Sequence, residues 1–104
     1  MTDRQLLPLK ILQGVDERIS RSVTVTSWGS TPTAVTVVAW DVTVTPWTNV
    51  SSTILTGAAS VAGDVITTPL IGGMTAGKTY RIEITFTVAS GNTFQPFFII
   101  MAEE

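Results

Sequence analysis

Nine consecutive residues in the second half of the chain alternate without interruption between large apolar and polar side chains. In residues 80–88 every even-numbered position is apolar and every odd-numbered position is polar. A period of two puts successive side chains on opposite faces of a β-strand, whereas a helix would repeat its apolar positions every 3.6 residues. The segment therefore predicts a strand with one face in a hydrophobic core, made of Tyr80, Ile82, Ile84, Phe86 and Val88.

The segment after this strand predicts that the chain turns back as an antiparallel hairpin. Residues 89–93 contain Ser-Gly-Asn, which tolerates the positive φ angles of a tight turn. Residues 94–101 then form the second arm. Pro96 cannot donate a ladder hydrogen bond, so we expect it at a bulge or on an unpaired side. Residues 97–101 are apolar at every position, so both faces of this strand need cover.

The remaining sequence predicts an all-β domain of about seven short strands. Only 13% of the 104 residues are charged, and Thr, Ser and Val fill the positions where helical surfaces carry Lys and Glu. Further strands are expected at residues 22–27, 34–45, 52–55, 58–61 and 65–67, with a bulge near 38–40. Turns every eight to twelve residues favour a two-sheet antiparallel β-sandwich, and the length allows one domain.

Residues 1–14 form a distinct segment before the sandwich domain at residues 15–104. Pro8 interrupts any helix there, and the segment contains five large apolar residues: Leu6, Leu7, Leu9, Ile11 and Leu12. Two interpretations stay open. The alternation of residues 7, 9 and 11 fits a first edge strand of the sandwich. The same segment also fits an arm that pairs with a neighbouring subunit by strand addition, and its removal would then leave the sandwich folded.

The residue types present argue against several functions. The chain has neither cysteine nor histidine, which removes the common nucleophiles, general bases and transition-metal ligands. Asp41, Asp64 and Glu83 are far apart in sequence and form no catalytic motif; Asp41 and Asp64 leave calcium as the one metal worth testing. The formal charge is −2 with no basic run. We therefore expect no enzyme, no cofactor, no nucleic-acid partner and no membrane partner.

Four aromatic residues stand out as candidates for packing or binding. Tyr80, at the start of the best strand, matches the tyrosine corner of immunoglobulin-type sandwiches, where the hydroxyl bonds to upstream backbone. Trp40 lies inside a strand pattern and is expected in the core. Trp28 and Trp47 lie beside turn residues and are expected to be partly exposed. They could cover the ends of the sandwich, anchor a protein interface or stack on sugar rings.

The chain after its N-terminal part resembles small tailed-bacteriophage virion proteins of the fibre-tail adaptor type. The matching residues run from a Gly-x-x-x-Gly-x-x-Tyr approach to the alternating strand into a Ser-Gly hairpin: Gly73, Gly77, Tyr80, Ser90 and Gly91. Trp40-Asp41-Val42 is similar to the family's Trp-x-Val strand. The resemblance covers about the last two-thirds of the chain. It implies an immunoglobulin-like sandwich and a non-enzymatic structural or assembly role in the virion, at the tail, neck or fibre attachment.

The resemblance also implies that the partners are other virion proteins and further copies of the chain. The residues expected at such contacts are Leu6, Leu7, Leu9, Ile11, Leu12, Trp28 and Trp47. A carbohydrate-binding or adhesive immunoglobulin-like module is the alternative, and it depends on Trp28 and Trp47. An enzyme has no catalytic group of residues to support it.

Overall fold

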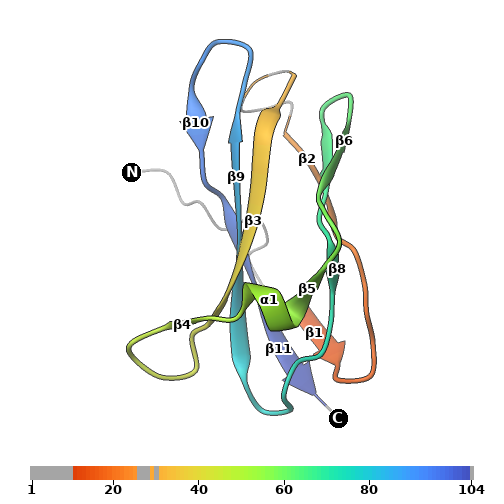
Figure 1. The fold of residues 1–104 in the computed structure, drawn as a ribbon, viewed down its shortest axis with the longest axis vertical. Helices are drawn as coiled ribbons and strands as arrows, with labels where there is room; N and C mark the ends of the chain where they lie inside the picture. Colours follow the sequence, from red (N-terminus) through yellow and green to blue (C-terminus); the bar gives the residue numbers. More distant parts are fainter. Residues whose placement is uncertain (1–10, 26–28, 30, 104) are drawn as a thin grey trace.

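The computed structural model describes residues 11–25, 29 and 31–103, which form an all-β, sandwich-like fold (Figure 1). The larger layer is a six-stranded sheet. Its strands lie in the order β1 (Ile11–Gly14), β11 (Phe97–Glu103), β9 (Thr79–Thr87), β3 (Thr33–Asp41) and β4 (Thr48–Asn49), and β10 (Thr93–Phe94) also pairs with β9.

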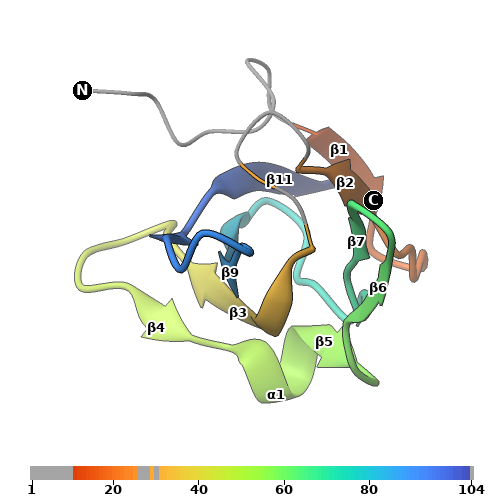
Figure 2. The same ribbon diagram turned by 90° about the horizontal axis from the view of Figure 1, so that it is seen from above.

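The second layer consists of two smaller sheets. One sheet contains β2 (Ser22–Thr24), β7 (Val65–Thr67) and β6 (Ser60–Ala62), and the other pairs β5 (Leu55–Thr56) with β8 (Leu70–Ile71). A four-residue helix, α1 (Ser51–Ile54), leads from β4 into β5 (Figure 2). The prediction of an all-β sandwich is confirmed, although residues 51–54, where a strand was expected to begin, are helical.

The core lies between the two layers, and β9 contributes most of its large side chains. The predicted alternation is confirmed, because Tyr80, Ile82, Ile84, Phe86 and Val88 are all at most 3% exposed. They pack with core residues from β11 and from the second layer: Phe98, Ile100, Ile66 and Ile71. The polar residues between them lie on the outer face of the six-stranded sheet.

The hairpin after β9 forms as the sequence predicts. The N–H of Val88 donates to the carbonyl of Asn92 (3.0 Å), and Gly91 has a φ of +92°, which suits a residue without Cβ. Pro96 lies between β10 and β11, where its carbonyl accepts a bond from the N–H of Ile84 (2.9 Å). Pro96 therefore lies at a break between two strands that keep one register with β9, and it faces β9, so the expected bulge or unpaired side is not observed.

The hydroxyl of Tyr80 ties the start of β9 to the preceding turn. The N–H of Thr75 donates to this hydroxyl over 2.9 Å, and the tyrosine is 3% exposed. Gly77, inside the same turn, has a φ of +83°, and its N–H donates to the carbonyl of Ala102 on β11 (3.0 Å). The predicted tyrosine-corner contact is confirmed.

We expect Tyr80→Phe to lower the free energy of unfolding by about 1–2 kcal/mol. The ring would still fill the core, but the N–H of Thr75 would lose its partner. For a domain of this size the Tm should fall by about 5–15 °C. Thermal denaturation followed by circular dichroism measures this, with Thr79→Val, also on β9, as the reference variant. An unchanged Tm for Tyr80→Phe would show that the hydroxyl contributes nothing.

Strand β3 differs from the prediction in two ways. Its ladder with β9 is regular from Thr36 to Asp41, and the irregularity lies between Thr33 and Thr36, where Ala34 has a φ of +52°. No bulge forms at residues 38–40. Alternation along the regular part buries Ala39 and turns Trp40 to the outer face, so the prediction of Trp40 in the core is wrong. The strand ends at Asp41 rather than at residue 45.

Residues 11–14 form an edge strand of the chain's own sheet. Strand β1 pairs with β11 in parallel, with Ile11 opposite Ile100, so the predicted antiparallel sandwich contains one parallel pair. Gln13 is 1% exposed and donates from Nε2 to the carbonyl of Ile71 on β8 (2.7 Å). It accepts at Oε1 a bond from Nη2 of Arg21 (3.2 Å). Gln13 thus fastens β1 to both layers.

The edge-strand interpretation of the N-terminal segment therefore holds for residues 11–14. The described part of the chain begins at Ile11, so Leu6, Leu7 and Leu9 lie outside the described residues. Whether residues 1–10 contact a neighbouring subunit stays a prediction.

Candidate partner-binding surface

Aromatic and charged side chains gather on the outer face of the six-stranded sheet. We define the outer-face cluster as Trp40 on β3, Trp47 just before β4, Arg81 and Glu83 on β9, and Phe97 on β11. The register explains the gathering: Trp40 lies opposite Arg81 and Phe97 lies opposite Glu83. Four segments separated by up to 57 residues thus supply one surface.

The side chains of the outer-face cluster hold one another in place. Nε of Arg81 donates to Oε2 of Glu83 (2.8 Å), and Nε1 of Trp40 donates to Oε1 of the same carboxylate (2.9 Å). The guanidinium carbon of Arg81 lies 3.6 Å from the ring centre of Phe97 and 5.2 Å from that of Trp47. The guanidinium is therefore fixed by a carboxylate and by two aromatic rings.

This surface has the composition of a protein-binding hot spot. Trp and Arg are the residue types over-represented at hot spots, and fixed side chains lose little entropy when a partner binds. Trp47 is 46% exposed, whereas the side chains of Arg81 and Glu83 are 23% and 12% exposed. An exposed ring beside a held guanidinium can contact a partner through both apolar surface and hydrogen bonds.

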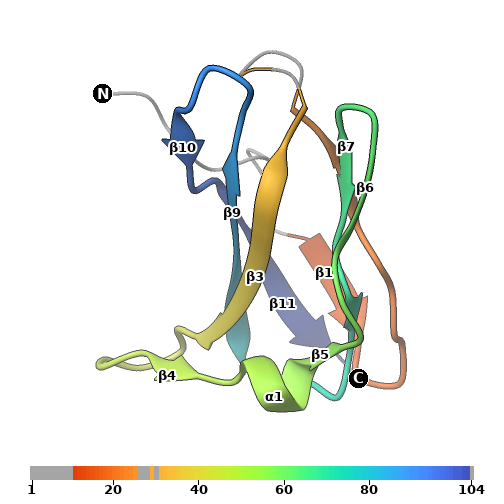
Figure 3. The same cartoon turned by 45° about the horizontal axis from the view of Figure 1, so that its top comes forward.

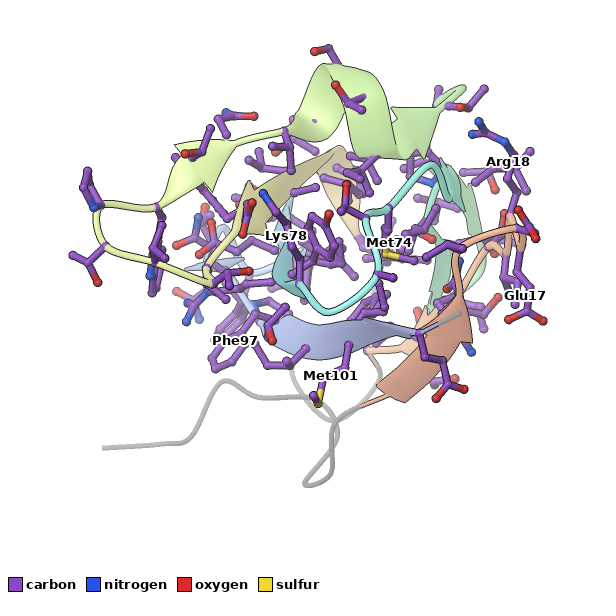
Figure 4. All side chains as sticks on the ribbon, turned by 90° about the horizontal axis from the view of Figure 1, so that it is seen from below. Glu17, Arg18, Met74, Lys78, Phe97 and Met101 are labelled. Carbon is purple, nitrogen blue, oxygen red and sulfur yellow. The ribbon has the colours of Figure 1, made fainter. Side chains whose placement is uncertain are left out.

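An apolar row on β11 continues the outer-face cluster. Phe97, Ile99 and Met101 alternate with the buried Phe98 and Ile100. Figure 4 shows Phe97 and Met101 on the side of β11 that faces away from Met74 and the core. Phe97 and Ile99 are half-buried, and Met101 is 36% exposed. The expected two-sided apolar character of this strand is thus seen in the structure.

The structure describes only part of the predicted contact set. Trp47 is exposed as expected, and Ile11 and Leu12 lie in β1. Trp28, like Leu6, Leu7 and Leu9, is outside the described residues. Strand β1 is at one edge of the six-stranded sheet and β4 is at the other, so Trp47 and residues 11–12 do not meet. Their roles in binding stay predictions.

Sequence reasoning missed three members of the cluster as binding candidates. From the sequence, Trp40 is expected in the core, Phe97 is only part of a two-faced strand, and Arg81 carries no binding prediction. In the structure Arg81 forms an ion pair with Glu83. The alternation of the strand predicts that residues 81 and 83 lie on the same face. The contact of Arg81 with Trp47, however, depends on the β3–β9 register and on the loop before β4.

The three carboxylates considered for chemistry have separate surroundings. Oδ2 of Asp41 pairs with Nζ of Lys78 (3.1 Å), and Asp64 accepts from the N–H of Thr31 (3.2 Å). Hydrogen bonding to the hydroxyl of Thr43 lowers the pKa of Asp41; desolvation opposes this, and the Thr43 N–H and Lys78 lower it further. Asp41 ends β3, whereas Asp64 lies in the β6–β7 turn at the opposite end of the fold (Figure 1).

Residues 11–25, 29 and 31–103 contain no group of three or more His, Cys, Asp or Glu side chains placed to hold a metal ion. The same residues include no helix with the length and apolar character needed to cross a membrane.

Comparison of the chain with protein-family models, with curated proteins and with solved structures found no significant match.

Proposed function

We propose that this chain is a non-enzymatic structural or assembly protein of a bacteriophage virion, located at the tail, neck or fibre attachment, and that it acts by binding other virion proteins. The observation that carries the proposal is the outer-face cluster, where Arg81 is held between Phe97 and Trp47. Such a surface suits protein binding better than catalysis, because its carboxylate is already bonded to Arg81 and Trp40.

The fold supports the immunoglobulin-like part of the proposal. Strands β3, β9 and β11 are neighbours in one layer and β2, β7 and β6 in the other, which agrees with the two-sheet order of immunoglobulin domains. The tyrosine corner at the start of β9 agrees with it too. Gly77, Tyr80 and Gly91, which carry the resemblance to fibre-tail adaptor proteins, have the turn and corner geometry that such a motif requires.

A carbohydrate-binding module is the second candidate, and the exposure of Trp47 favours it. A flat, exposed ring can stack on a sugar. The nearby Arg81 guanidinium could donate to sugar hydroxyls. The two candidates differ in what Trp47 would contact, a protein surface or a glycan, so one variant tests both.

We expect Trp47→Ala to reduce incorporation of the chain into virions by tenfold or more without changing its Tm by more than a few degrees. Loss of a hot-spot tryptophan costs 2 kcal/mol or more in binding, which corresponds to about a thirtyfold loss of affinity. Quantitative mass spectrometry of particles purified from cells encoding the chain measures incorporation. Val44→Ala is the matched control, since Val44 is apolar, 68% exposed and in the same loop.

Two results would contradict the proposal. One is absence of the wild-type chain from purified particles. The other is normal incorporation of Trp47→Ala together with glycan binding that this variant abolishes, which would establish the carbohydrate-binding alternative.

A further inference from the structure

Within the part of the chain that the structure describes, one edge of strand β3 has no partner strand over most of its length. On one side it pairs with β9 from Thr36 to Asp41, but on the other side β4 pairs only with Trp40 and Asp41. The next residue, Ala39, is also satisfied: its N–H donates to Oγ of Ser51 (2.9 Å) and its carbonyl accepts from the N–H of Val50 (2.9 Å). Beyond Ala39 toward the start of the strand, no described segment pairs with this edge.

The backbone groups of Val37 face this open edge, and so does the carbonyl of Val35, because the next residue, Thr36, pairs with Thr85 on β9. In a strand, alternate residues direct their N–H and C=O groups to the same side, and Ala39 directs its groups away from β9. The pairing with β9 supports this orientation. Ile84, which lies opposite Val37, donates its N–H to the carbonyl of Pro96, on the side of β9 that faces away from β3. Unpaired N–H and C=O groups on an edge strand are a template for another strand.

An open pocket of about 410 Å³ lies along this edge. Strand β3, helix α1 and the segment around β5 form its walls, and Figure 3 shows β3 beside β5 and β6 there. The described residues that line it include Val35, Val37, Leu55, Ala59 and Pro69, together with Ser51, and none of them is charged. The pocket therefore suits an uncharged, extended apolar peptide that hydrogen-bonds to the edge of β3 and inserts alternate side chains.

The chain itself contains a segment of this kind at residues 5–9, Gln-Leu-Leu-Pro-Leu. If Leu7 and Leu9 directed their backbone groups to Val35 and Val37, Pro8 would face away from β3. Because proline has no N–H, it matters that no hydrogen bond from Pro8 to β3 would be needed in this orientation. The side chains of Leu7 and Leu9 would share one face, on the side of the half-buried Val35 and Val37, which pack against the core.

Residues 7–9 of the same chain are too close to β1 to reach this pocket. Across the sheet, Ile11 is separated from β3 by three strand spacings, which is about 14 Å. Along the strand direction, the registers place Ile11 four residues away from the level of Val37, which is about 13 Å. The separation is therefore about 19 Å. Leu9 lies within about 7 Å of Ile11 and Leu7 within about 14 Å, even when the chain is fully extended. If this segment fills the pocket, a second copy therefore supplies it.

We infer that the pocket beside β3 binds residues 5–9 of a second copy of this chain as an added β-strand. The inference deepens the proposed function, on which it rests, by naming the site and the segment through which copies associate. Residues 11–14 of each copy stay in their own sheet, so only the ten preceding residues cross to the neighbour.

Disulfide trapping tests this contact directly, because the chain has no cysteine of its own. Two full-length variants, Leu9→Cys and Ala59→Cys, are mixed under mild oxidation, one of them carrying a size tag. We expect a mixed disulfide at least tenfold more abundant than in the matched mixture of Leu9→Cys with Thr85→Cys, since Thr85 lies on the outer face of β9. Equal yields in the two mixtures would overturn the inference.

Association in solution gives a second, independent measurement. We expect the wild-type chain to be dimeric or larger by light scattering at micromolar concentration. Ala58→Arg, which puts a charge in the pocket at an exposed position, should make it monomeric, whereas Ala62→Arg, exposed on β6 and outside the pocket, should not. A monomeric wild-type chain, or association unaffected by Ala58→Arg, would overturn the inference.

The two proposals fail in distinguishable ways. A chain that is incorporated into particles but gives no mixed disulfide would refute the strand addition and leave the virion role standing. A chain that forms the mixed disulfide but is absent from particles would refute the virion role. A double variant, Leu9→Cys with Ala59→Cys, that closes an intrachain disulfide at high dilution would show that its own segment reaches the pocket and would overturn the inference.

Discussion

Ile84→Asp is expected to abolish folding, whereas Thr85→Asp should change the free energy of unfolding by no more than about 1 kcal/mol. Ile84 is completely buried at the centre of β9, and Thr85, the next residue, lies on the outer face. An unpaired carboxylate in an apolar interior costs several kcal/mol. The free energy of unfolding of a small domain is about 5–15 kcal/mol, so this single change is expected to remove most of it.

Far-ultraviolet circular dichroism and thermal denaturation of both variants measure the difference. Thr85→Asp is the matched control, because it introduces the same side chain one residue away. A cooperative transition for Ile84→Asp at the Tm of Thr85→Asp would mean that the two faces of β9 are assigned incorrectly.

Deletion of residues 1–14 is expected to destabilise the sandwich by about 2–6 kcal/mol and to lower its Tm by at least about 10 °C. The deletion removes β1 from the edge of β11 and leaves the backbone groups of that edge unpaired. It also removes Gln13, so the buried carbonyl of Ile71 and the guanidinium of Arg21 each lose a hydrogen bond. Among the described residues the buried Nε atom of Arg21 has no hydrogen-bond partner, so the loss of Gln13 leaves this guanidinium with still fewer hydrogen bonds.

Deletion of residues 1–10 is the control, because it keeps β1 and Gln13. We expect this shorter deletion to leave the Tm nearly unchanged and to abolish self-association. If deletion of residues 1–14 also leaves the Tm unchanged, β1 contributes nothing to stability. If deletion of residues 1–10 unfolds the domain, the first ten residues belong to the chain's own fold rather than to a neighbour.

Local patterns were sufficient to predict the hairpin of β9 and β11 and the fold class. The alternation over residues 80–88 and the turn at Ser90-Gly91 each reflect a backbone requirement that depends on adjacent residues. The Tyr80 corner was also predictable, because its partner, Thr75, lies only five residues upstream. Features whose partners are close in sequence could be inferred from the sequence alone.

The prediction for Trp40 was wrong because the face on which this side chain lies depends on the exact register of β3. Four consecutive apolar residues, 37–40, interrupt the alternation of β3, and the sequence analysis placed Trp40 in the core. The ladder with β9 selects Ala39 instead. A shift by one residue exchanges the two faces of a strand, so only the pairing with β9 could settle the position of Trp40.

By itself, the sequence determined the fold class, the buried face of β9 and the presence of an apolar N-terminal segment. Period-two patterning and turn chemistry act over a few residues, and the printed residues specify them completely. The tertiary structure alone decided that Trp40, Trp47, Arg81 and Phe97 form one surface, that Gln13 holds β1 in place and that no described strand covers most of one edge of β3. These features join residues between 7 and 58 positions apart, and the order and register of the strands bring them together.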